Sequence, residues 1–165
     1  MSIYNTDLNK MVIQHTLKTL GICSKAIENL LLGTAAAQAR LAPPLKKPNG
    51  IGAYGIDKET HCSIWDDYLA FDSDLASTIR GLASQHEFLK NPHIELATNL
   101  AYATAIAWMI YKRNDVILPH PDNIEGLAQC WAECFVKNSD TKKAKLTFID
   151  AYLESTNNSS PNIAA

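Results

Sequence analysis

The sequence predicts an all-α protein of about seven helices around one central buried helix at about residues 92–113. Apolar residues recur at three- and four-residue intervals through most of the chain. No two alternating segments flank a hairpin turn signal. The 165 residues, 47% hydrophobic and 19% charged, fit one globular domain. We expect that domain over residues 1–154, followed by a flexible polar tail over 155–165.

The first two helices are predicted at about 6–20 and 24–41. Helical spacing of apolar residues defines the first helix, and Gly21 ends it. Ser24 is an N-cap residue for the second helix, in which apolar and small residues share one face.

Residues 42–56 are expected to form the one long loop, because prolines and glycines within them forbid regular structure. Ile51–Ile56 could form a short extended piece there. Beyond the loop, Asp57 and Ser73 are each placed to cap an amphipathic helix. Long ordered loops often carry function, so the loop and its flanking helices are the first place to seek a site.

The central helix has the clearest start signal in the chain. Asn91 stands at the cap position and Pro92 at the first helical position. Small and apolar residues cover nearly its whole circumference up to about Arg113, which predicts burial on all sides. A further helix is expected at about 122–137, and a last one from Asp140 to near Glu154.

Charge and composition exclude several classes of function. Lys and Arg total 15 against 17 Asp and Glu, so the net charge of −2 offers no field for nucleic acid or an anionic membrane. The longest uncharged stretch, Leu96 to Tyr111, is too short for a membrane span. Asp7 and Lys10 interrupt the apolar run that a signal peptide would need, which predicts cytoplasmic synthesis without one.

Neither a metal site nor a cofactor is expected from the residues. Cys130 and Cys134 lie four apart on a helical face, where a buried pair of small side chains is favoured over a metal or redox pair. His61 and Cys62 point about 100° apart on a helix, so they are no ready nucleophile and base. Lys46 and its neighbours form a local basic patch, either solvated or in contact with an anionic partner.

Several segments in a fixed order resemble a family of phage-encoded lysozyme-like proteins, and through it the soluble lytic transglycosylases. The resemblance covers about residues 28–113 and is carried by Leu30–Thr34, Gly52–Ile56, Thr60-His61, Ile64-Trp65 and Asn99–Ala107 with Tyr111 and Arg113. It implies a mostly helical lysozyme-like fold and cleavage of the β-1,4 bond of peptidoglycan. In such chemistry a glutamic acid donates a proton to the leaving oxygen.

The resemblance breaks at that acid. In the family pattern the acid follows Gly-Thr-Ala-Ala in a Gln-Glu-Ser-Gly run, whereas this chain places Gln38 at the acid's position. An amide cannot release a proton to a leaving group. Gly55 likewise stands where relatives carry a glutamine. Asp57 and Glu59 are possible substitute acids, although both fit better as N-cap and first-turn charge of their helix.

A second set of residues would line the glycan cleft that the resemblance implies. These candidates for substrate binding are Tyr54, Thr60, His61, Trp65, Tyr102 and Tyr111. For each of them, packing in the core is the alternative, because aromatic residues at helical spacing are more often core than sugar platform. Tyr54 is expected to be the most exposed, since it lies in the loop.

Three functions remain open. The favoured one is a catalytically inactive lysozyme-like protein that serves as a structural or interaction subunit of a phage tail, baseplate or related particle, with other particle proteins as partners. The first alternative is an active peptidoglycan hydrolase that uses Asp57 or Glu59 as its acid. The second alternative is a glycan-binding module without turnover.

Overall fold

The computed structural model describes residues 7–42, 45–136 and 140–157, and within these ranges the protein is all-helical. The only β-type pairing among them is an isolated bridge between Ile51 and Ile56, which is the short extended piece expected in the loop. The elements are η1 (Leu8–Ile13, a π-helical segment), α2 (Gln14–Thr19), α3 (Lys25–Arg40), α4 (Lys58–Asp67), η2 (Leu69–Phe71), α5 (Ser73–Leu82), α6 (Gln85–Lys90), η3 (Pro92–Ile94), α7 (Glu95–Thr98), α8 (Leu100–Arg113), α9 (Ile124–Phe135) and α10 (Thr141–Asn157).

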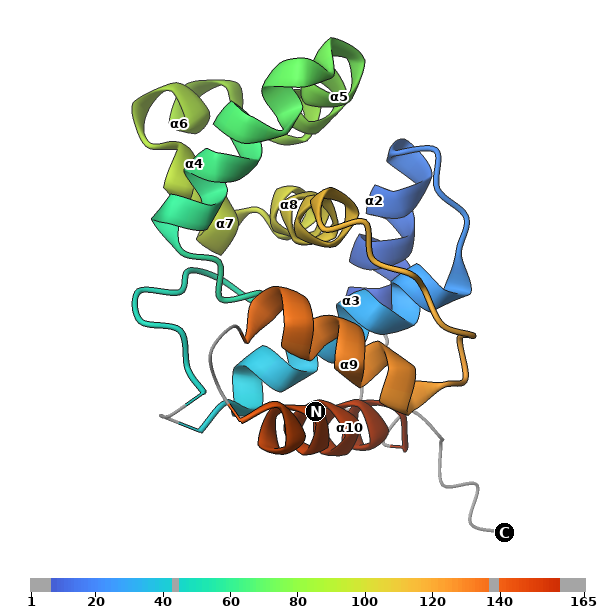
Figure 1. Ribbon diagram of the computed structural model, residues 1–165. Helices are drawn as coiled ribbons and strands as arrows, with labels where there is room; N and C mark the ends of the chain where they lie inside the picture. Colours follow the sequence, from blue (N-terminus) through green and yellow to red (C-terminus); the bar gives the residue numbers. More distant parts are fainter. Residues whose placement is uncertain (1–6, 43–44, 137–139, 158–165) are drawn as a thin grey trace, which may run out of the picture.

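Helices α3, α9 and α10 pack against one another on one side of the molecule (Figure 1). Helices α3 and α10 approach each other closely at Gly33. A Cβ on Gly33 would lie 2.2 Å from the ring of the buried Phe148. Glycine is therefore required at this helical position by the close contact with the ring.

Helix α8 is the centre of the fold, as the sequence predicted. Every residue from Tyr102 to Tyr111 is buried. In Figure 1 it is seen nearly end-on, with α4 to α7 on one side and α2 on the other, and it also contacts α3 and α9. Its circumference is apolar because neighbours cover it all round.

The prediction of one continuous helix over 92–113 was wrong. Asn99 has an extended backbone (φ −121°, ψ 95°) and separates α7 from α8. Its side chain caps α8 by accepting a hydrogen bond from Tyr102 N at 3.0 Å, and it also donates to Leu82 O at 2.8 Å. An asparagine side chain competes with the helical backbone for hydrogen bonds. Asn99, which was predicted inside the helix, is therefore the N-cap of α8.

Smaller differences concern helix ends. Helix α6, capped by Ser84, was not predicted, and Asp72 rather than Ser73 caps α5. Asp140 does accept from the first turn of α10, but that helix continues to Asn157 and includes the buried Ser155. Residues 155–157 of the predicted flexible tail are therefore helical, and its residues 158–165 lie outside the described part of the chain.

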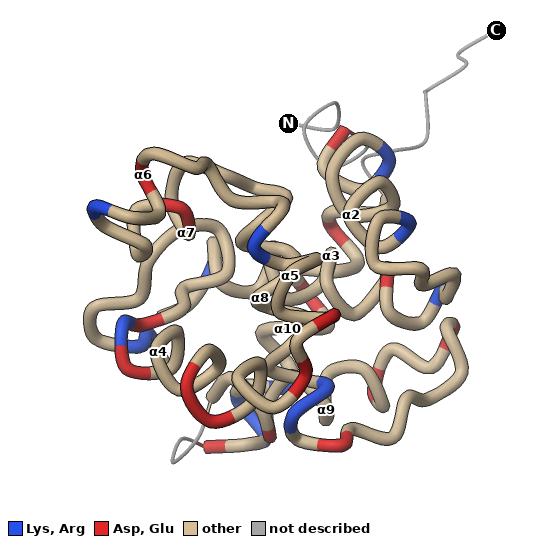
Figure 2. The backbone as a smooth tube through the Cα atoms, turned by 90° about the horizontal axis from the view of Figure 1, so that it is seen from above, with Lys and Arg blue, Asp and Glu red and all other residues tan. Residues whose placement is uncertain are grey.

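No helix among the described residues is both long and apolar enough to cross a bilayer. Lysines and arginines alternate with aspartates and glutamates around the described chain rather than gathering on one face (Figure 2).

Candidate functional site

A groove lies between the end of α3 and the loop before α4. Its volume is about 510 Å³. Side chains of α3, Gln38 among them, form one wall, and the loop forms the other. We call it the Gln38 groove; its lining residues are Leu8, Ala35, Ala36, Gln38, Ala39, Lys46, Lys47, Gly50, Gly52, Ala53 and Gly55.

Gln38 and Gly55, two of the positions at which the sequence departs from the pattern expected from the resemblance, meet in this groove. A Cβ on Gly55 would lie 2.5 Å from Oε1 of Gln38. Gly55 also has a positive φ of 57°, a conformation that residues with side chains rarely adopt. The Gln38 amide thus occupies space that a side chain at position 55 would need.

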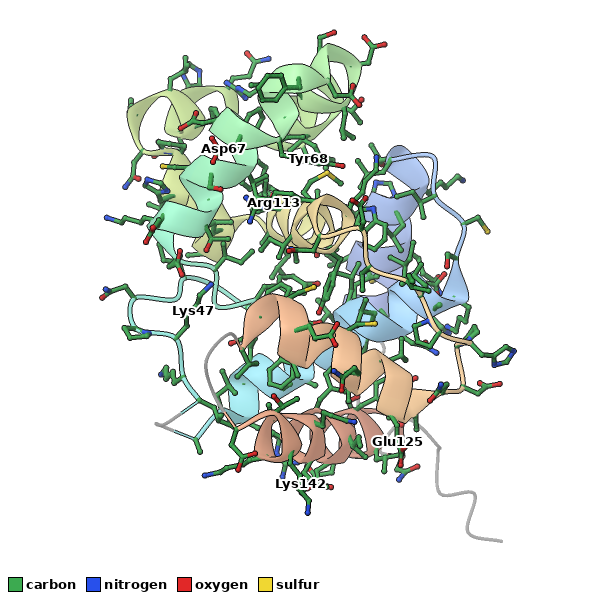
Figure 3. All side chains as sticks on the ribbon, viewed as in Figure 1. Lys47, Asp67, Tyr68, Arg113, Glu125 and Lys142 are labelled. Carbon is green, nitrogen blue, oxygen red and sulfur yellow. The ribbon has the colours of Figure 1, made fainter. Side chains whose placement is uncertain are left out.

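No carboxylate lines the Gln38 groove among the described residues, and its two charged lining side chains are Lys46 and Lys47. Lys47 lies on the loop beside the start of α4, where Nζ is 2.9 Å from Asp57 Oδ2 (Figure 3). The same ammonium donates to Thr60 Oγ1 at 3.2 Å. The groove is therefore neutral to positive.

Asp57 is ill suited to replace the missing acid. Its Oδ1 caps α4 by accepting from Thr60 N at 2.7 Å. Burial raises the pKa of the Asp57 carboxyl, but hydrogen bonds from Thr60 and Lys47, with the Lys47 charge, outweigh burial and lower the pKa. A general acid needs a raised pKa, because it must hold its proton at neutral pH. Glu59 is exposed and does not line the groove.

The predicted cleft residues do not gather in the Gln38 groove. Tyr54 was expected at the surface, and this was wrong: it is fully buried, and its hydroxyl is 3.0 Å from Thr104 Oγ1. The buried Tyr111 hydroxyl is 2.6 Å from Thr34 Oγ1. Both tyrosines follow the core-packing alternative, because each hydroxyl forms a hydrogen bond with a threonine of a different element.

Three other predicted residues do come together, away from the groove. His61 Nε2 is 2.6 Å from the Tyr102 hydroxyl, and Trp65 Nε1 donates to the same oxygen at 2.8 Å. Sequence reasoning missed a fourth member, His93, whose Nδ1 is 2.9 Å from His61 Nδ1. We call these four residues the imidazole network. They tie α4 to η3 and α8.

Sequence reasoning also missed a buried carboxylate. Glu95 is 1% exposed. Its Oε2 accepts from Ser84 N at 3.1 Å and from Asn99 Nδ2 at 2.9 Å. These bonds fix the turn before α6 against the break between α7 and α8. Glu95 is not among the residues that line the Gln38 groove.

The cysteines and histidines form no metal site in the described ranges, where no three ligand-type side chains converge. Cys130 and Cys134 are buried on α9, as the packing interpretation predicted. Burial, and then the nearby Glu133 charge, raise the pKa of the Cys130 thiol. A raised pKa makes this thiol a poor nucleophile.

Comparison with known proteins gives no relative: no protein-family model, no curated protein and no solved structure matches this chain.

Proposed function

We propose that this chain is a lysozyme-like protein without hydrolytic activity that acts as an interaction subunit of a phage tail or phage-derived particle. The role in a phage particle is inferred from the sequence resemblance. The loss of hydrolysis is supported by one observation above the others, the presence of Gln38 in a groove whose charged lining side chains are both lysines. A positioned acid contributes about 10²–10⁴-fold to such reactions.

A zymogram on purified peptidoglycan tests the loss of hydrolysis. We expect no clearing by the wild-type chain. Clearing that Asp57→Asn or Glu59→Gln abolishes would overturn the proposal and establish an active hydrolase. Mass spectrometry of purified particles then tests the assembly role, and we expect this polypeptide at a defined stoichiometry to the other particle proteins.

Gln38→Glu sharpens the same test. A carboxyl at position 38 would share the groove with Lys46 and Lys47, and nearby cations lower the pKa of a carboxyl. We therefore expect this variant to remain inactive at neutral pH. Clearing by Gln38→Glu, but not by Gln38→Met, would show that the groove still holds glycan in a reactive position.

A glycan-binding role without turnover is the second candidate. The presence of the Gln38 amide in the lining of the groove favours this role. The Gln38 amide both donates and accepts hydrogen bonds, as sugar hydroxyls do. Muropeptide binding measured by calorimetry should weaken in Gln38→Ala. Tyr54→Ala is a poor test, since Tyr54 is buried and its loss would damage the core.

A further inference from the structure

The imidazole network joins three elements through one buried histidine. His61 on α4 is 1% exposed, and its two ring nitrogens face different partners. Nε2 lies 2.6 Å from the Tyr102 hydroxyl on α8, and Nδ1 lies 2.9 Å from Nδ1 of His93 on η3. Each contact is short enough to require one hydrogen between its two atoms.

Counting the available hydrogens identifies the donor and the acceptor in each contact of the imidazole network. The Tyr102 oxygen already accepts from Trp65 Nε1, so its own hydrogen is best given to His61 Nε2. Nε2 of His61 then carries no hydrogen, and Nδ1 carries it and donates to His93 Nδ1. In this arrangement every polar atom named here is satisfied, and both imidazoles are neutral.

A further proton breaks the arrangement. Protonation of His93 at Nδ1 places two N–H groups against each other across 2.9 Å. Moving the His61 hydrogen to Nε2 relieves this contact, but Nε2–H then points at Tyr102 and the tyrosine hydroxyl loses its acceptor. Both outcomes leave a polar group unpaired in a buried place, which is unfavourable.

The surroundings disfavour the charged forms. Burial, and then the charge of His93, lower the pKa of His61 to about 4. Burial, and then the charge of Lys58 on α4, lower the pKa of His93. Burial raises the pKa of Tyr102 on α8, and the hydrogen bond from Trp65 lowers it. The charge of Glu95 on α7 raises the same pKa, and the charge of Arg80 on α5 lowers it. Asp66 on α4 lines a cavity of about 280 Å³ beside both histidines, but it forms no ion pair with either in the described structure.

Through this cavity, protons from solvent can reach His61 and His93. His61 and His93 both line it, and Trp65 and Phe88 form its apolar wall. His93 is only partly buried, so it is the more accessible of the two histidines.

We propose that the contact between His61 and His93 is an acid-sensitive latch that holds the segment of α6 and η3 on α4 at neutral pH and releases it as the pH falls. The inference is independent of the proposed function, since it uses no residue of the Gln38 groove. Histidine pairs act as switches in this way because their charge changes near physiological pH.

The first experiment uses the wild-type chain alone. Long-range ¹H–¹⁵N spectra of the imidazoles at pH 7.5 should show His61 with its hydrogen on Nδ1. Amide hydrogen exchange, corrected for intrinsic rates, should show at least a tenfold loss of protection over residues 85–94 between pH 7.5 and pH 5, with α3 and α10 unchanged. A His61 hydrogen on Nε2 at pH 7.5, or no change in exchange, overturns the proposal.

His93→Gln supplies the matched variant. The glutamine carbonyl can accept from His61 Nδ1 but does not titrate in this range. We expect native near-ultraviolet circular dichroism at pH 7.5 and a smaller acid-induced loss of protection over residues 85–94 than in the wild type, because the buried His61 remains. His86→Gln on α6 is the control, since His86 is exposed, and it should respond to acid as the wild type does. An equal acid response in His93→Gln and wild type would contradict the latch.

Discussion

The Gln38 groove and the imidazole network hold their polar side chains in opposite surroundings. In the network, each polar atom of His61, Trp65 and Tyr102 has a protein partner, and two of these residues are almost fully buried. In the groove, Gln38 and Lys46 face open space beside glycine and alanine. The residues that look most functional in the sequence stabilise the fold, whereas the open surface is chemically sparse. Substitutions should therefore affect stability in one region and binding in the other.

The largest effect is expected where the groove loop meets α7. A Cβ on Gly52 would lie 1.8 Å from Leu96 O, and the φ of Gly52 is 70°. Gly52→Ala should lower the free energy of unfolding by about 3 kcal/mol in urea denaturation, because backbone must shift. Gly81→Ala is the control. Gly81 has open space around it within α5, so alanine should stabilise by about 0.5 kcal/mol. A small effect at Gly52 would mean that the loop is free to move.

Tyr102→Phe should have the next largest effect. It removes the oxygen that Trp65 and His61 share and leaves both nitrogens without that partner. The expected loss is about 2 kcal/mol in urea denaturation. Tyr68→Phe, at a tyrosine for which no hydrogen bond is seen in the described structure, should change stability by less than about 0.5 kcal/mol. Equal effects of the two variants would show that the network contributes little.

The two regions should lose stability in different pH ranges. The pKa of His61 is lowered by burial from 6.5 to about 4, so the unfolded chain binds more protons in that range and stability falls as the pH drops below about 6.5. The lowered pKa of Asp57 gives a separate loss below its ordinary value of 3.8. Urea denaturation from pH 8 to 3 should resolve both. His93→Gln should reduce the first loss, and Lys47→Met only the second.

The smallest effect on stability is expected at the groove itself. Gln38 is partly exposed and lines the groove, and no hydrogen bond of its side chain is seen among the described residues. Gln38→Ala should change the free energy of unfolding by less than about 0.5 kcal/mol. A loss above about 1 kcal/mol would show that the amide is a packing element over Gly55, and the distinction between the two regions would fail.

Local signals in the sequence determined the helical class and many of the helix ends. Gly21 ends the first helix with a φ of 71°, and Asp57 caps α4, as predicted. These features depend on neighbours within a few residues, which is why they could be predicted.

Only the tertiary structure decided which polar residues face the groove and which serve the interior. Spacing along one helix cannot tell that Tyr54 meets Thr104, that His61 meets His93, or that Asn99 would interrupt the central helix to bind Leu82. Each of these contacts joins residues that are 17 to 50 positions apart. Burial and hydrogen-bond satisfaction depend on the partner brought from elsewhere in the chain, and that information appears only when the helices pack.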